Sequence, residues 1–158
     1  MTLHHAPCGL LSVDHQDKMG EHKVDIGDGL FKTRVSKDGE DIVGGEILNT
    51  AKHVQASIDN GEGCRVHGGF SVKKVPGNFH LSFHGFHDLF HDVRGDFLFS
   101  HTINHLSFGR QHRNEYISNM FGEGTHTDFA PYDGHSEVQK SRAVTSYEYY
   151  LDIIPIQY

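Results

Sequence analysis

The chain has 158 residues, of which 36% are hydrophobic and 22% charged, as expected for one globular domain and not for a disordered chain. Lys and Arg number 14 against 21 Asp and Glu, for a formal net charge of -7, which argues against a nucleic-acid partner. The 15 histidines make this charge sensitive to mild acid, with +8 as the upper bound if all of them protonate. Neither a membrane span of ~20 apolar residues nor a signal peptide is visible.

Short runs of alternating apolar and polar residues, separated by glycine-rich turns, predict a mainly β fold. The turns are expected at Gly27-Asp28-Gly29 and at Pro76-Gly77. The predicted strands form two hairpins and a final strand, namely residues 23–26 with 30–35, 64–73 with 79–83, and 145–153. We therefore expect an antiparallel β-sandwich of two packed sheets with one or two short helices, in a single domain over residues 1–158.

Helical spacing of apolar residues is found in two places. The first predicted helix runs from Ile47 to Ile58 and is capped by Asn60-Gly61. The second covers Phe83 to Val93. Residues 110–141 show little periodicity, so most of them are expected to be loop, with a short helix or strand near 116–121.

The two cysteines, Cys8 and Cys64, are far apart and form no Cys-x-x-Cys motif. A redox dithiol and a four-cysteine zinc site are therefore excluded. Composition alone leaves two readings open, a single disulfide closing a long loop or two buried thiols.

Several motifs resemble a known family when they are taken in chain order. Its lumenal domain begins with segments similar to residues 6–14 and 31–39 here and ends with one similar to 150–155. Between them lie Glu-Gly-Cys-Arg-Val-His-Gly at 62–68, Lys-Val-Pro-Gly-Asn-Phe-His at 74–80 and Asn-His-Leu-Ser-Phe-Gly at 104–109. These segments resemble the ERGIC/Erv family, membrane proteins that cycle between the endoplasmic reticulum and the Golgi in coated vesicles, over about two thirds of the chain.

The resemblance implies a lumenal β-sandwich whose two flanking transmembrane helices are absent from this chain. It implies a receptor subunit that works with a paralogous subunit, gathers protein cargo or retrieves escaped residents, and is not an enzyme. The resemblance implies a domain without a cofactor or a bound metal. Because the lumen is oxidising, the resemblance also favours a disulfide between Cys8 and Cys64. It assigns structural roles to five motif positions: Gly77, Asn78, His105, Ser107 and Gly109.

This sequence departs from the family pattern in three places. The variable segment between the two cysteines, about residues 42–62, is short here, so the function of longer inserts is not carried over. The chain stops soon after the hydrophobic-Pro pair at 154–155, which is expected to leave a strand edge exposed. Residues 82–92 are richer in histidine and phenylalanine than the family pattern.

The stripe His84, His87 and His91 lies on one arc of the second predicted helix, beside Asp88 and Asp92. The carboxylates favour the charged imidazole, so a pH-sensing or binding surface is the preferred functional reading. Two alternatives stay open, a transition-metal site and a set of solvated histidines. Signatures such as His-Glu-x-x-His are absent.

We expect no catalytic residue. The sequence His105-Leu106-Ser107-Phe108-Gly109 lacks the first glycine of a Gly-x-Ser-x-Gly elbow, and His105 is expected to make a buried structural hydrogen bond. The predicted function is thus a lumenal cargo or retrieval receptor domain that is pH-sensitive through its histidines. The alternatives are a metal-binding or redox-linked enzyme domain, as in thioredoxin-fused relatives, and a carbohydrate-binding β-sandwich.

Overall fold

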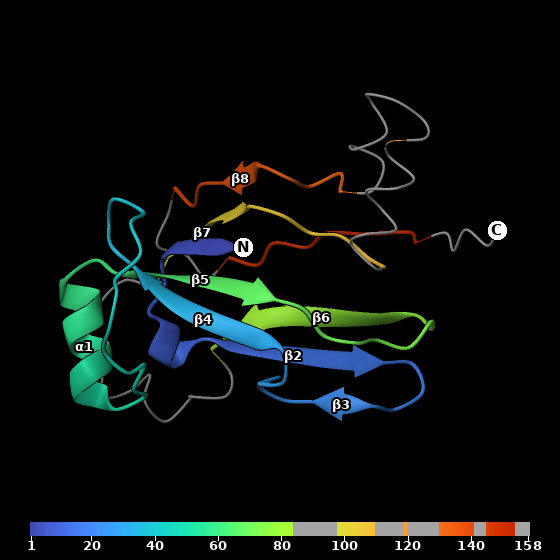
Figure 1. The fold of residues 1–158 in the computed structure, drawn as a ribbon, viewed down its shortest axis with the longest axis horizontal. Helices are drawn as coiled ribbons and strands as arrows, with labels where there is room; N and C mark the ends of the chain where they lie inside the picture. The colour runs from blue at the N-terminus through green and yellow to red at the C-terminus, as the bar shows by residue number, and fades with distance from the viewer. Residues whose placement is uncertain (84–97, 110–118, 120–129, 141–144, 154–158) are drawn as a thin grey trace.

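The computed structural model describes residues 1–83, 98–109, 119, 130–140 and 145–153, and the remaining residues are thin grey traces in Figure 1. The described strands form two antiparallel sheets, which confirms the predicted β-sandwich. The larger sheet has, in spatial order, β4 (Leu30–Val35), β5 (Gly63–Gly68), β1 (Thr2–His5), β7 (Leu98–Ile103) and β8 (His135–Glu137). The smaller sheet has β3 (His22–Lys23), β2 (Ser12–Asp17) and β6 (Gly77–Ser82).

The core joins the two sheets and one helix. Leu3 and Val66 of the larger sheet pack in the same buried cluster as Val13 of the smaller sheet and Val54 of helix α1 (Ala51–Asp59). The helix was predicted, but it begins at Ala51, and Ile47 lies exposed before it. A single turn of 3-10 helix, η1 (Cys8–Leu10), connects β1 to β2.

The first predicted hairpin is wrong. The strand that follows β2 is the two-residue β3, which pairs with β2, whereas β4 pairs with β5 in the other sheet. Between them the chain crosses from one sheet to the other, and the Ile26 N–H donates to the carbonyl of Val13 at 2.8 Å. Local alternation predicts strands but not their partners, because the sheet is completed by residues far along the chain.

The second predicted hairpin is wrong for the same reason. β5 ends at Gly68 and pairs with β1 and β4, while β6 pairs along its whole length with β2. Residues 69–76 form a connection across the smaller sheet instead of extending β5. Phe70 of this connection packs edge-on against His15 and Phe79, with ring centroids 5.9 and 6.1 Å apart.

The prediction of a strand over 145–153 is also wrong, since these residues adopt no regular secondary structure. Conversely, β8 lies in a region expected to be loop. Tyr147 and Tyr149 do alternate, but their side chains contact His101 of β7, and Tyr149 also contacts His135 of β8. The second predicted helix after Phe83 and nearly all of residues 116–121 lie outside the described residues. In the described ranges no helix combines the length and apolar character required to cross a bilayer.

Candidate functional site

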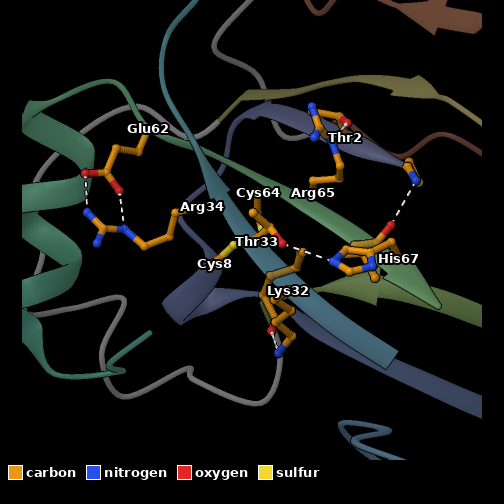
Figure 2. The surroundings of a disulfide bond; sticks show 12 residues. Thr2, Cys8, Lys32, Thr33, Arg34, Glu62, Cys64, Arg65 and His67 are labelled. Atoms are coloured by element: carbon orange, nitrogen blue, oxygen red, sulfur yellow. Dashed lines mark hydrogen bonds and ion pairs between the residues drawn. A yellow bond between two sulfur atoms is a disulfide. The ribbon is translucent and has the colours of Figure 1, made fainter. Parts of the chain in front are cut away.

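The disulfide between Cys8 and Cys64 is present in the structure and lies in the buried core. It joins η1, the segment leading into the smaller sheet, to β5 of the larger sheet, with the two Cα atoms 4.9 Å apart (Figure 2). Cys64 pairs with Leu3 of the central strand β1, so the bond is made to an interior strand of the larger sheet. Both cysteines are therefore accounted for by one crosslink between η1 and β5.

A bidentate ion pair lies beside this disulfide (Figure 2). Arg34 of β4 donates from Nε and Nη2 to the two carboxylate oxygens of Glu62, at 2.8 and 2.6 Å. Glu62 is only 4% exposed, and the hydrogen bonds from Arg34 lower the pKa of its carboxyl group. The pair joins β4 to the end of the helical segment, and we call it, together with Cys8 and Cys64, the disulfide corner.

Two of the motif positions, Gly77 and Asn78, begin β6. Gly77 lies against Asp17 and Asn78 against Gln16 in the β2–β6 ladder. A Cβ atom on Gly77 would be 2.7 Å from the carbonyl oxygen of Gln16, so only glycine allows this approach of the two backbones. This observation supports a structural role for Gly77.

The motif histidine His105 makes hydrogen bonds, but the expected burial is wrong, because its side chain is 60% exposed. Its Nδ1 lies 2.6 Å from Asp133 Oδ2 and its Nε2 lies 2.9 Å from Ser107 Oγ. This is the order of a serine hydrolase triad, but a triad aspartate is buried and Asp133 is exposed. Asp133 also accepts the Leu106 N–H at 2.9 Å, so these groups fasten the loop after β7 to the turn before β8. Gly109 ends the motif with φ +93°, a conformation suited to glycine.

A buried histidine that no sequence motif marks as a site lies in β7. His101 is 2% exposed, and its Nδ1–H donates to the carbonyl of Phe99 at 2.7 Å. With Nδ1 protonated, the Nε2 of the neutral ring accepts the hydroxyl proton of Tyr149, 2.7 Å away. Burial raises the pKa of Tyr149, so its hydroxyl remains a donor.

Further rings surround this hydrogen bond. The ring of Tyr147 lies edge-on to that of His101, with the ring centroids 5.0 Å apart. The ring centroids of Tyr132 and His135 lie 5.1 and 5.6 Å from that of Tyr149. We call His101, Tyr132, His135, Tyr147 and Tyr149 the tyrosine cluster. The alternation of Tyr147 and Tyr149 was a signal for it, but alternation also describes a strand.

His4 of β1 lies near the tyrosine cluster. Its Nε2 is 3.0 Å from Thr102 Oγ1, and burial, with the nearby His5 and His101, lowers its pKa. Of the ten histidines that the structure describes, only His15 and His101 are buried. The described histidines thus differ in their exposure to solvent.

The predicted stripe of His84, His87 and His91, with Asp88 and Asp92, lies outside the described residues. Its readings as a pH-sensing surface or a metal site stay predictions. Elsewhere, over the described ranges, no three His, Cys, Asp or Glu side chains gather so as to hold a metal ion.

Comparison with known proteins gives a consistent result. The profile of the family described as "Endoplasmic reticulum vesicle transporter" matches residues 36–158. The whole chain is 28% identical to 56% of the "Probable endoplasmic reticulum-Golgi intermediate compartment protein 3" of Dictyostelium discoideum. It is 32% identical to 42% of the "Endoplasmic reticulum-Golgi intermediate compartment protein 1" of Xenopus laevis.

A third relative is more distant. Over 61% of its length, the present chain is 28% identical to a segment that makes up 26% of the "ER-derived vesicles protein ERV46" of Saccharomyces cerevisiae. The chain spans about half the length of the curated relatives that it matches over its full length. No solved structure matches it significantly. The profile match covers most of the chain and agrees with the resemblance seen in its motifs, so the chain belongs to the endoplasmic reticulum vesicle transporter family, the ERGIC/Erv family.

Proposed function

We propose that this chain is the lumenal domain of a membrane protein that cycles between the endoplasmic reticulum and the Golgi as a cargo or retrieval receptor subunit. The observation that carries the proposal is the family match over residues 36–158. The relatives are named for the endoplasmic reticulum-Golgi intermediate compartment and for vesicles derived from the endoplasmic reticulum, which supports the same location for this protein.

The disulfide supports placement on the lumenal side. Disulfides persist in oxidising compartments, including the lumen of the endoplasmic reticulum, and are rare in the cytosol. Cys8 and Cys64 are the only cysteines of the chain, and both are consumed by this bond. In the proposal the domain is anchored to the membrane by segments of the full-length protein outside this chain.

The proposed activity is binding, without chemistry by the domain itself. Its partners are protein cargo and a paralogous subunit of the same family. We assign pH sensitivity to the stripe His84, His87 and His91, because protonation near pH 6 would add positive charge beside Asp88 and Asp92. Cargo affinity then differs between the neutral endoplasmic reticulum and the more acidic Golgi.

Isolation of the tagged full-length protein from vesicle membranes, followed by identification of the co-purifying proteins, tests the receptor role. Lumenal cargo and a paralogous subunit are expected in the isolate. Recovery of the tagged protein without either of them would contradict the proposal.

A second measurement tests the pH dependence. The affinity of an identified cargo is compared at pH 7.2 and pH 6 for the wild type and for a variant with His84, His87 and His91 changed to Asn. The variant is expected to lose the pH dependence. A matched control with His5, His22 and His53, all exposed, changed to Asn is expected to keep it. Equal wild-type affinity at the two pH values would refute the pH part alone.

A further inference from the structure

One end of the smaller sheet carries an exposed cluster of lysines that we call the basic tip. It consists of the β2–β3 turn and the connection over residues 69–76. A hydrogen bond joins these two segments, from the Lys18 N–H to the carbonyl of Pro76 at 3.0 Å. Two apolar side chains are exposed in the same segments, Met19 at 72% and Val72 at 45%. The lysines of the basic tip are Lys18, Lys23, Lys73 and Lys74.

The acidic groups of the basic tip are already paired. Glu21 accepts Lys73 Nζ at 2.7 Å and Lys23 Nζ at 3.0 Å, which lowers the pKa of its carboxyl group to about 2. The buried Asp17 lies 3.6 Å from Lys73 Nζ. Among the described residues, no carboxylate lies within ion-pairing distance of Lys18 or Lys74. The basic tip therefore has an excess of positive charge on a molecule of net negative charge.

The β2–β3 turn, which contains Met19, is held by hydrogen bonds to the side chain of Asp17. Asp17 Oδ1 accepts the N–H groups of Met19 at 2.8 Å and of Glu21 at 2.9 Å. Gly20 between them has φ +88°. Because these contacts hold the backbone in one conformation, an incoming partner meets a surface that is already ordered.

The opposite end of the molecule carries the complementary chemistry, in a segment that we call the acidic loop, residues 38–46. Val43 in this loop is 96% exposed. Asp41 pairs with Arg65, whereas no cation of the described residues pairs with Asp38, Glu40 or Glu46. The base of the loop is ordered, since the Ile42 N–H donates to the Arg34 carbonyl at 2.9 Å.

The two surfaces of one copy cannot meet. The acidic loop follows Val35 at the end of β4, where Gly63 is the partner residue in β5. The connection of the basic tip leaves from the other end of β5, at Gly68, whose partner is Leu30. Figure 1 shows the loop after β4 on the left and the turns after β2 and β5 on the right. A contact between the two surfaces therefore requires two molecules.

We propose that the basic tip of one molecule docks onto the acidic loop of a second copy. Lys18 and Lys74 face Asp38, Glu40 and Glu46 across this contact, and Met19 and Val72 cover Val43. The charge complementarity between two ordered, exposed segments of the same chain selects a second copy as the occupant. The inference goes beyond the proposed receptor function and does not depend on it.

The geometry sets the type of assembly. The contact is head-to-tail, joining different surfaces on the two molecules, so it extends into a row or closes into a ring. Its ion pairs lie at the surface and are screened by salt. Association is therefore expected to grow with protein concentration and to weaken as the ionic strength rises.

Sedimentation velocity of the 158-residue chain at low ionic strength tests the proposal with two charge-reversal variants. The wild type is expected to show a sedimentation coefficient that rises with concentration and falls to the monomer value in high salt. The variants Lys18→Glu/Lys74→Glu and Glu40→Lys/Glu46→Lys are each expected to be monomeric, because each replaces an attraction by a repulsion. An equimolar mixture of the two is expected to associate, since the reversed tip of one complements the reversed loop of the other.

The control variant Lys52→Glu/Lys140→Glu makes the same change in net charge as Lys18→Glu/Lys74→Glu, at exposed positions outside both surfaces, and is expected to associate like the wild type. Circular dichroism checks that every variant is folded. A monomeric wild type at every concentration, or a mixture that does not associate, overturns the proposal. So does a monomeric wild type whose basic tip instead binds vesicles containing phosphatidylserine, a binding lost in Lys18→Glu/Lys74→Glu.

Discussion

The disulfide corner and the tyrosine cluster both attach a distant segment to the larger sheet, but they do so by different means. In the disulfide corner, a covalent bond and an ion pair fix η1 and the end of the helical segment to β5 and β4. In the tyrosine cluster, residues 145–153 are attached to β7 and β8 by ring contacts and by the hydrogen bond between Tyr149 and His101.

The difference concerns what each attachment depends on. A disulfide restricts the unfolded chain and is insensitive to moderate changes of pH. The tyrosine cluster instead relies on non-covalent contacts, namely ring contacts and one hydrogen bond, which can open locally without unfolding of the core. We therefore expect the disulfide corner to dominate global stability and the tyrosine cluster to control the local attachment of the C-terminal residues.

The largest expected effect comes from breaking the covalent bond. The double variant Cys8→Ala/Cys64→Ala removes a crosslink between residues 56 positions apart and is expected to lower the free energy of unfolding by about 2–4 kcal/mol. Urea denaturation measures the loss. Because the chain has no other cysteine, reduction of the wild type should reproduce it. An unfolding midpoint unaffected by reductant would show that the corner is held without the bond.

The ion pair of the same corner gives the second effect. Glu62→Gln leaves Arg34 without its charged partner and is expected to cost about 1.5–3 kcal/mol at pH 7. The folded-state pKa of Glu62 is lowered, so the stabilisation is present above the unfolded pKa of ~4.3 and disappears as the pH falls through the folded value. The difference between variant and wild type should therefore shrink below about pH 4.

The control for this prediction is Glu40→Gln, an exposed carboxylate for which a change within about 0.5 kcal/mol is expected. Denaturation of the three proteins from pH 7 to pH 3 makes the comparison. A gap between Glu62→Gln and wild type that stays constant over this range would contradict the role assigned to the charge.

The smallest expected effect concerns the tyrosine cluster. Tyr149→Phe removes the hydroxyl bonded to His101 and is expected to cost about 1 kcal/mol, with faster amide exchange in residues 145–153. Tyr150→Phe is the matched control, because its exposed hydroxyl contacts Glu148 two residues away. Equal exchange in the two variants would mean that the ring contacts alone hold the segment.

The sequence predicted the class of the fold and several of its elements, but not how the strands pair. Alternation of apolar and polar residues located β4, β5 and β6, although in β6 only the last two residues, Leu81 and Ser82, are half-buried or buried. It assigned the wrong partners, since β5 pairs with β1, more than sixty residues earlier, and β6 pairs with β2. Alternation describes one strand at a time and contains no information about a partner that distant.

At the candidate site, the disulfide was inferred from the family resemblance, because spacing alone left two buried thiols as an alternative. The burial of His101 was not predicted, since its burial is created by tyrosines about 48 residues further on. The prediction for His105 was wrong in the opposite sense, because its motif position suggested a buried role and the structure places its side chain on an exposed loop. In each case the environment depends on contacts between distant segments.

The antiparallel pairing of β4 and β5 has a practical consequence. The β4–β5 ladder runs from the Leu30–Gly68 pair to the Val35–Gly63 pair and closes the loop that contains α1. The two strands are therefore expected to keep their register when residues are added to this loop. Lengthening such a loop costs little additional entropy. The pair Gly44-Gly45, beside the exposed Val43, is accordingly a position where an inserted epitope is expected to leave the fold intact while blocking the proposed contact between the acidic loop and the basic tip.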